Sequence, residues 1–405
     1  MSAKILYGIC FIGLLLSACT GGSKQWLNEN EYSLLSALDE QPIVASVEMV
    51  NSDSVWTFHY SKLGSDTLTF PLSEFVEELN LLKLDGSDEA LVPVGRVIAS
   101  ENYLLVQGKQ QIPYKLFDKK GRFIANIGSF GQGPGEYQLI YDEQIDEPGN
   151  RIYLLPWNAK ALLAYDLQGN FVQSIPLPTI VPKGMFKADT KKSQLQVFLL
   201  PFKHLPFVAW NQTFDGHILD TIPSRHLAIQ PDFSNEVYSN KNSTAFDVSL
   251  FTFWERRPDT LYHHIGNRLK PQFTMEYSAG KMPIHSYWEL PGYFTGDVAV
   301  EKQLSENTFS TEKPIDYIID KQSLRGCYYK VMNDLFGGVE ITYFAFKCRY
   351  GYYCENWEPA HLQETLQTIL NNKKDLSDSE RQRLMQLMGG ITENDNNYIV
   401  WGKLK

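Results

Sequence analysis

The chain has 405 residues, of which 21% are charged and 13% are aromatic, and its formal net charge is −10. An acidic balance argues against nucleic acid and against an anionic membrane surface as partners, and we interpret it as simple solubility. The high aromatic content favours a β-rich structure, and the length is enough for one large domain or for two or three ordinary ones.

The N-terminal residues predict an export signal that is cleaved. Lys4 is followed by an apolar run over residues 5–16, which is shorter than the ~20 residues that span a bilayer. A Leu-Ser-Ala-Cys tetrad ends at Cys19 and resembles the bacterial lipobox, whose cysteine carries lipid in the mature protein. We therefore expect a signal peptide over residues 1–18 and lipidation of Cys19. An ordinary secretory signal with an incidental cysteine is the alternative.

The residues after Cys19 indicate a destination. Residues 19–41 open with a Thr-Gly-Gly-Ser stretch, which is typical of a flexible tether. The second residue after the cysteine is Gly21 and not Asp, which resembles the outer-membrane class of enterobacterial lipoproteins, and no acidic cluster for surface export follows. We expect the protein to be anchored in the outer membrane by lipid alone, facing the periplasm rather than the cell surface.

A repeated phrase in the middle of the chain predicts the fold. Residues 117–127 and 165–175 both contain an aromatic residue, an Asp, a turn with a Gly, and an alternating strand, and Gly121 and Gly169 are 48 positions apart. A weaker echo follows at residues 214–219. A turn-and-strand period near 50 residues is typical of β-propeller blades.

We therefore expect an all-β fold, a six-bladed β-propeller over residues 42–405, with four strands and about 60 residues per blade. The strand near Val44 is expected to complete the last blade beside Tyr398–Trp401, because such closure removes a free sheet edge.

The glycine-rich run from Ile127 to Tyr137 lies between predicted strands. Glycines can hold an anion with backbone amides, but no Lys-Ser/Thr pair and no helix start follow, so we interpret the run as a tight loop between blades. The run resembles the Gly-x-x-Gly-x-Gly-Pro-Gly-Glu signature of six-bladed β-propeller lipoproteins of Bacteroidetes, a group related in pattern to NHL-repeat propellers. The segment from Asp259 to Tyr262 and the lipobox agree with that family, which the chain resembles from about residue 75 to 290. The resemblance implies a fold and a location but no catalytic residues.

Four acidic residues follow this run at Asp142, Glu143, Asp146 and Glu147. They lack the spacing of a calcium loop, and we interpret them as a solvated turn. His263 and His264 are neighbours on a predicted strand and point to opposite faces, so they cannot jointly bind a metal there. No nucleophile-elbow or zinc-protease motif occurs. The sequence predicts no catalytic residue, no metal site and no cofactor.

The C-terminal quarter contains the three cysteines that remain in the mature chain. Cys348 and Cys354 flank Gly351, and if this glycine forms a hairpin tip the two cysteines face each other within bridging distance. A disulfide between them is permitted, but we favour three buried free thiols, Cys327 included.

Two helices are expected in an insertion over residues 356–390. Apolar residues line one face over residues 359–370, and a second helix begins at Ser377 with the capping-box residue Glu380 and ends at residues 389–390. Because about 35 residues rarely fold alone, this hairpin should pack on the propeller.

Two classes of function fit these features. The leading hypothesis is a lipid-anchored envelope protein, expected to be a monomer, that binds or holds a protein or glycan partner and no nucleic acid. The alternative is a calcium-dependent hydrolase or lyase with the metal in the propeller channel, which needs inward-facing carboxylates at matching blade positions.

The long loops are the expected recognition surface. Candidate segments are residues 178–192, residues 224–244 with Phe233 and Tyr238, and residues 287–294. Aromatic loop residues stack on sugars or anchor a partner chain. The residues that we expect to line one binding face are Trp254, Arg256, Trp288 and Tyr293.

Overall fold

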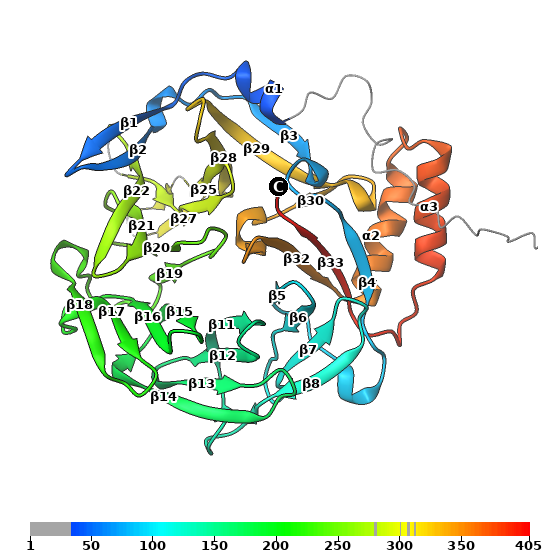
Figure 1. The fold of residues 1–405 in the computed structure, drawn as a ribbon. Coiled ribbons are helices and arrows are strands. Elements are labelled where there is room, and N and C mark those ends of the chain that lie inside the picture. The colour runs from blue at the N-terminus through cyan, green and yellow to red at the C-terminus, as the bar shows by residue number, and fades with distance from the viewer. Residues whose placement is uncertain (1–33, 279–281, 300, 306–307, 312) are drawn as a thin grey trace, which may run out of the picture. The chain divides into compact units, whose positions relative to one another are not determined.

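Short sheets follow one another around a common axis in the computed structural model of the chain, which is a β-propeller arrangement (Figure 1). The structure describes residues 34–278, 282–299, 301–305, 308–311 and 313–405. The predicted signal peptide, Cys19 and most of the tether lie outside the described residues. The described part contains three α-helices, and none of them is long and apolar enough to cross a membrane.

Four sheets have the plain form of a blade, with four antiparallel strands in each. Apolar side chains fill the space between neighbouring sheets; Leu116 and Leu154, for example, are fully buried in one shared cluster. Burial of such a side chain contributes about 1.5–3 kcal/mol. The strands of these sheets are β5 (Val97–Ala99), β6 (Tyr103–Val106), β7 (Tyr114–Asp118) and β8 (Phe123–Ile127); β11 (Ile140–Asp146), β12 (Arg151–Pro156), β13 (Ala159–Tyr165) and β14 (Phe171–Val181); β15 (Gly184–Asp189), β16 (Gln194–Leu199), β17 (Phe207–Thr213) and β18 (Ile218–Pro223); and β31 (Cys348–Arg349), β32 (Tyr352–Trp357), β33 (Tyr398–Lys403) and β4 (Asn80–Lys83).

Two further sheets are larger, with six and seven strands. The expected six uniform blades of four strands are therefore wrong, because N-terminal strands that the repeat did not reveal add to sheets built from distant residues. β1 and β2 extend one sheet and β3 extends the other by parallel pairing with β29. These strands are β1 (Ala45–Val50), β2 (Asp53–His59), β22 (Arg268–Glu276), β21 (Thr260–Ile265), β20 (Phe246–Phe251) and β19 (Glu236–Tyr238); and β23 (Ile284–His285), β24 (Trp288–Leu290), β25 (Tyr293–Ala299), β28 (Ile315–Asp320), β29 (Gly326–Asn333), β30 (Val339–Ile341) and β3 (Thr67–Pro71). Two-stranded sheets pair β9 (Ser129–Phe130) with β10 (Glu136–Tyr137) and β26 (Glu301–Ser305) with β27 (Thr308–Thr311).

The repeated phrase forms the same turn in two sheets. In each copy the Asp carboxylate, of Asp118 or Asp166, accepts hydrogen bonds from the backbone N–H groups two and four residues later. Gly121 and Gly169 have φ values of 81° and 84°, a conformation that residues with a Cβ rarely adopt. The turn chemistry predicted from the period is therefore confirmed at both sites.

The glycine-rich run forms a loop between the β5–β8 and β11–β14 sheets, as expected. The Tyr137 hydroxyl donates to the Ile127 carbonyl at 2.6 Å, and the Tyr165 hydroxyl donates to the Gly135 carbonyl at 2.9 Å. A Cβ on Gly128 would lie 2.7 Å from both tyrosine side chains. The glycines thus make room for aromatic side chains that join two sheets, which is a structural use.

The chain closes its ring differently from the prediction. β33 pairs with β4, so that Val400 lies opposite Leu81. Val44 instead directly precedes β1, and that strand pairs with β2. The expectation that the strand near Val44 completes the last blade is wrong, although an N-terminal strand does cover the edge of the C-terminal one.

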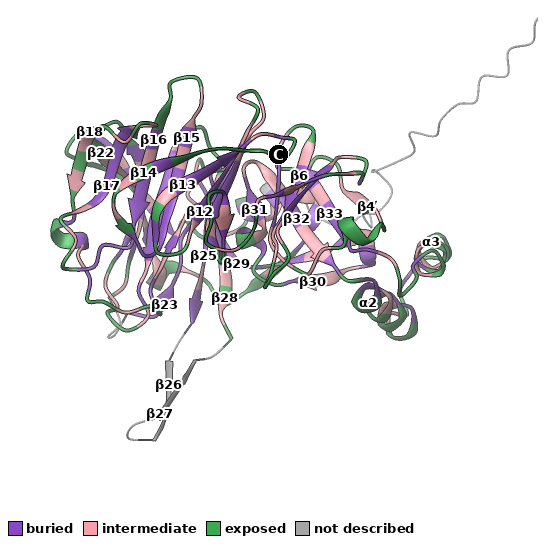
Figure 2. Ribbon diagram, turned by 90° about the horizontal axis from the view of Figure 1, so that it is seen from below, coloured by how far each residue is buried: buried purple, intermediate pink, exposed green. Residues whose placement is uncertain are grey.

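The helical hairpin lies beside the sheets at the rim, as predicted (Figures 1 and 2). The helices are α1 (Leu34–Asp39), α2 (Pro359–Asn372) and α3 (Asp378–Gly389). Ser377 and Glu380 form the expected capping box at the start of α3. Leu362 and Leu366 of α2 and Leu384 of α3 are fully buried in one cluster with the β29 and β32 sheets, so the insertion shares the propeller core.

The cysteine hairpin has its tip at Gly351, but the two cysteines do not face each other. Tyr350 and Gly351 both have positive φ values, 57° and 77°, and form a two-residue turn that pairs Cys348 with Tyr353. Cys354 is one position further along and lies in a different apolar cluster from Cys348. Cys327, Cys348 and Cys354 are buried free thiols, which is the alternative that the sequence favoured, and the disulfide that it permitted is not formed.

Candidate functional site

A buried network of charged side chains joins the strands nearest the axis. Asp142 of β11 accepts from Lys241 at 2.6 Å and from Arg349 of β31 at 2.8 Å. Glu143 accepts from Arg96 Nε at 2.6 Å and lies 3.6 Å from Arg349 Nη1. Asp142 and Glu143 belong to β11 and Arg349 to β31, while Arg96 and Lys241 lie in connections next to other sheets, so the network holds several sheets together.

The prediction of a solvated acidic turn is wrong for this network. Asp142 and Glu143 are 0% and 1% exposed, because β11 continues through Asp146 and the turn begins only at Glu147. Burial alone would raise the pKa of Asp142, but Lys241 and Arg349 outweigh it and hold that pKa below its usual value. Among the described residues, no group of three or more His, Cys, Asp or Glu side chains could hold a metal ion.

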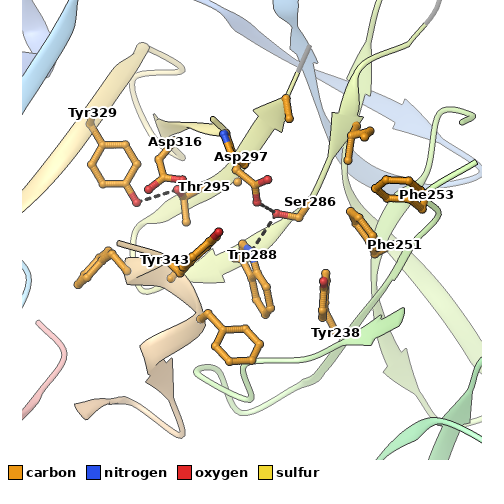
Figure 3. A pocket seen from close by; sticks show the side chains of 17 residues that line it. Tyr238, Phe251, Phe253, Ser286, Trp288, Thr295, Asp297, Asp316, Tyr329 and Tyr343 are labelled. Atoms are coloured by element: carbon orange, nitrogen blue, oxygen red, sulfur yellow. Dashed lines mark hydrogen bonds between the residues drawn. The ribbon is translucent and has the colours of Figure 1, made fainter. Parts of the chain in front are cut away.

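A cavity of about 250 Å³, which we call the aromatic pocket, is lined by other residues (Figure 3). Its lining combines aromatic rings with two carboxyl groups, and no Lys, Arg or His lines it among the described residues. The side chains that carry this character are Tyr238, Phe251, Phe253, Trp288, Tyr329, Tyr343, Phe344, Phe346, Ser286, Asp297 and Asp316.

The two carboxyl groups of the aromatic pocket lie on neighbouring strands. Asp297 of β25 is paired directly with Asp316 of β28, and Figure 3 shows both on one side, across from Phe251 and Phe253. The Ser286 hydroxyl donates to Asp297 and accepts from Trp288 Nε1 at 3.1 Å.

The pKa values of both carboxyl groups are raised. Burial, followed by repulsion from Asp297 and Glu340, raises the pKa of Asp316 to about 7. Burial also raises the pKa of Asp297, although the Ser286 hydrogen bond opposes the shift. Near neutral pH this pair can therefore both donate and accept hydrogen bonds.

A second cavity of about 330 Å³, which we call the arginine pocket, adjoins the first. Arg96 and Arg349 of the buried network line it, together with Leu139, Tyr141 and Glu236. Glu236 is neutralised by an ion pair with Lys183 and also accepts from the Tyr141 hydroxyl.

Three aromatic side chains line both cavities and so form a shared wall: Tyr238, Trp288 and Phe346. The rings of Tyr238 and Trp288 stack with their centroids 4.6 Å apart, and Phe346 meets Trp288 edge-on at 5.7 Å. Such contacts contribute roughly 0.5–1.5 kcal/mol each beyond burial, so the wall is a preformed surface.

The structure does not bring the four predicted ligand residues together in one pocket. Trp288 lines both cavities and is 8% exposed. Tyr293 lines a separate hollow near Phe75, while Trp254 is 62% exposed and meets Phe253 edge-on. Arg256 donates from Nε to the Phe253 carbonyl at 3.3 Å. Their role in ligand binding stays a prediction.

Two of the predicted recognition segments do contribute to the pockets. Tyr238 from the 224–244 segment and Trp288 from the 287–294 segment form the shared wall. Sequence reasoning missed Asp297, Asp316 and Tyr343. A weak signal was present, because Asp is depleted in β-strands and both acids lie within one, but their pairing depends on a register that the sequence does not reveal.

Comparison with known proteins places the chain among proteins without an assigned activity. A family model described as a domain of unknown function (DUF4934) matches residues 55–403. No curated protein matches the chain.

Among solved structures, a protein from Bacteroides fragilis NCTC 9343, described provisionally as exported, is 18% identical with a TM-score of 0.56 and covers 86% of this chain and 99% of its own. A member of the DUF4221 family from Bacteroides vulgatus ATCC 8482 is 11% identical with a TM-score of 0.40 and covers 82% of this chain and 97% of its own. The first of these similarities supports the fold alone.

Proposed function

The chain belongs to the DUF4934 family, whose description assigns no activity, and we propose that it is a cell-envelope binding module that holds a glycan in the aromatic pocket. The observation that carries the proposal is the composition of that pocket, in which aromatic rings surround paired carboxyl groups. Aromatic faces stack on the C–H faces of sugar rings, and carboxyl groups hydrogen-bond their hydroxyls. A flat protein interface would not need a concave pocket of this kind.

Location is part of the same proposal. The lipobox ending at Cys19 supports an anchor in the outer membrane with the propeller on the periplasmic side. The Bacteroides fragilis neighbour is described as exported, which is compatible with this location. A lipid-held binding module would keep a captured glycan close to the membrane.

The proposal is tested with two exposed residues of the aromatic pocket. Tyr343 is 63% and Phe346 44% exposed, so Tyr343→Ala and Phe346→Ala should leave folding intact. We expect each to weaken binding of oligosaccharides, measured by calorimetry and on a glycan array, by about tenfold, since stacking on one ring contributes on the order of 1–1.5 kcal/mol.

Trp157 is a matched control, because it is 45% exposed and lines neither cavity. Trp157→Ala should bind like the wild type. Wild-type binding by both pocket variants would remove the aromatic pocket as the glycan site. A protein partner that is captured equally well by all three variants would favour the protein-binding hypothesis instead.

A second candidate function is hydrolysis of the bound glycan. Directly opposed residues in antiparallel strands have Cβ atoms about 5 Å apart, which is close to the carboxyl spacing of retaining glycosidases, and the raised pKa of Asp316 suits a general acid. The hydrolase function would be established if the wild type cleaves oligosaccharides and Asp316→Asn loses this cleavage but still binds them. Calcium in the channel, part of the original hydrolase hypothesis, stays a prediction without a described ligand group.

A further inference from the structure

We propose that the arginine pocket is an oxyanion subsite, and that the ligand is an acidic saccharide whose sugar ring occupies the aromatic pocket while its carboxylate reaches Arg349 and Arg96. The saccharide part of this inference rests on the proposed function. The anion site rests on separate observations, because it concerns a different cavity with different charges.

The first observation is the balance of charge in the buried network. Three cations, Arg96, Lys241 and Arg349, face two carboxylates, Asp142 and Glu143. Glu236 and Lys183 form a pair of their own and do not alter this balance. Within these ion pairs the cations outnumber the carboxylates by one, and a buried charge is costly unless it is paired.

The second observation is that donors of the two arginines are unused. Arg349 is 5% exposed, and its Nε has no hydrogen-bond partner among the described residues. Among the described residues, its Nη1 makes only the 3.6 Å contact with Glu143. Arg96 donates through Nε and Nη2, and no partner of its Nη1 lies among the described residues. A buried charged donor without a partner is unusual, and a planar oxyanion can satisfy two guanidinium donors at once.

The third observation connects the two cavities. Tyr238, Trp288 and Phe346 line both, so the wall between them is one aromatic layer. Because the two cavities share these residues, a ligand that occupies both would carry its carboxylate close to its sugar ring. This geometry favours a uronic-acid type of saccharide over a neutral one.

The test adds charge at the rim without breaking the network. Leu139 lines the arginine pocket and is 55% exposed, so Leu139→Glu, Leu139→Gln and Leu139→Lys should all fold. The probes are glucuronate, a glucuronate-containing disaccharide, the corresponding neutral disaccharide and inorganic phosphate, each titrated by calorimetry. Leu91→Glu controls for net charge, because Leu91 is 42% exposed and lines neither pocket.

We expect the wild type to bind the acidic disaccharide more tightly than the neutral one. Leu139→Glu should weaken acidic binding about fivefold, as one repulsive charge nearby does, while Leu139→Lys retains it and Leu139→Gln and Leu91→Glu change it little. Equal affinities for acidic and neutral disaccharides, or equal binding by the three Leu139 variants, would overturn the proposal.

The probes separate this inference from the proposed function. Binding of glucuronate without either disaccharide would keep the oxyanion subsite and remove the glycan function. Binding of the neutral disaccharide as tightly as the acidic one would keep the glycan function and remove the oxyanion subsite. Phosphate binding that exceeds glucuronate binding would assign the subsite to phosphorylated ligands and overturn the uronic-acid assignment.

Discussion

At the scale of single residues, this propeller keeps two unlike electrostatic sites next to each other. Asp297 and Asp316 are close carboxyl groups without a described cation in their pocket, whereas Arg349 has an unused donor in a network whose cations outnumber its carboxylates by one. Both arrangements cost stability in the empty protein. Unfavourable electrostatics of this kind are common among ionisable groups at functional sites.

Asp316 gives a prediction about pH. In the unfolded chain its pKa is near 3.9, whereas in the fold burial and neighbouring acids raise it to about 7. Between these values the folded state holds a proton that the unfolded state has lost, so this residue's contribution to stability falls as pH rises from about 4 to 7. Asp316→Asn removes that penalty and should raise the melting temperature at pH 8.

At pH 8 the free energy of unfolding of Asp316→Asn should exceed that of the wild type by about 1–2 kcal/mol. This is less than the full pKa shift implies, because Asp316 is only partly buried. At pH 4, close to the unfolded pKa, the difference should largely disappear. Melting curves of both proteins at the two pH values check this. A variant that is equally or less stable than the wild type at pH 8 would show that the raised pKa is incorrect.

At the scale of elements, local interactions could be predicted and distant pairings could not. The Asp118 turn and the Ser377 capping box depend on residues within four positions of each other, so the sequence alone reveals them. The possible Cys348–Cys354 bridge is excluded by one residue of register, because the turn at Tyr350 and Gly351 places Tyr353 and not Cys354 opposite Cys348. A one-residue slip moves a side chain to the opposite face.

Closure by β4 is the distant pairing that most affects the fold, and it can be tested by crosslinking. Leu81 and Val400 lie directly opposite each other. The Leu84 N–H donates to the Asn397 carbonyl, so residues 84 and 397 form a hydrogen-bonded pair. Because hydrogen-bonded and non-hydrogen-bonded pairs alternate along antiparallel strands, the pair of Leu81 and Val400, three positions away, is a non-hydrogen-bonded one. Side chains approach most closely at such positions. Leu81→Cys combined with Val400→Cys should therefore form a disulfide on oxidation.

The matched control combines Leu82→Cys with Val400→Cys, whose side chains point to opposite faces. Peptide mapping under non-reducing conditions should find a crosslink in the first pair and none in the control. Equal crosslinking in both, or none in the first pair, would mean that β4 does not close the ring in this register.

At the scale of the whole molecule, the fold was predictable in kind but not in detail. The 48-residue offset between Gly121 and Gly169 indicates a propeller because two neighbouring blades reuse one turn. The site was only partly predictable. Tyr238 and Trp288 could be selected as aromatic residues on long segments, whereas Asp297 and Asp316 meet only through strand pairing. The side chains that make a pocket in a propeller come from different sheets, and no local pattern records their meeting.

Anchoring is the last property predicted for the whole protein. If Cys19 is the lipidated residue, Cys19→Ala should move the protein from the membrane fraction to the soluble envelope fraction, because two acyl signals hold a protein on a bilayer and their loss leaves no equivalent attachment. Cys10→Ala is the matched control, since Cys10 lies within the apolar run that is removed with the signal. Fractionation followed by immunoblotting checks both variants, and glycan binding by the released protein shows whether it remains folded. Membrane partitioning of Cys19→Ala equal to that of Cys10→Ala would mean that the Leu-Ser-Ala-Cys tetrad is not an anchor, and the proposed role would then be that of a freely diffusing binding protein.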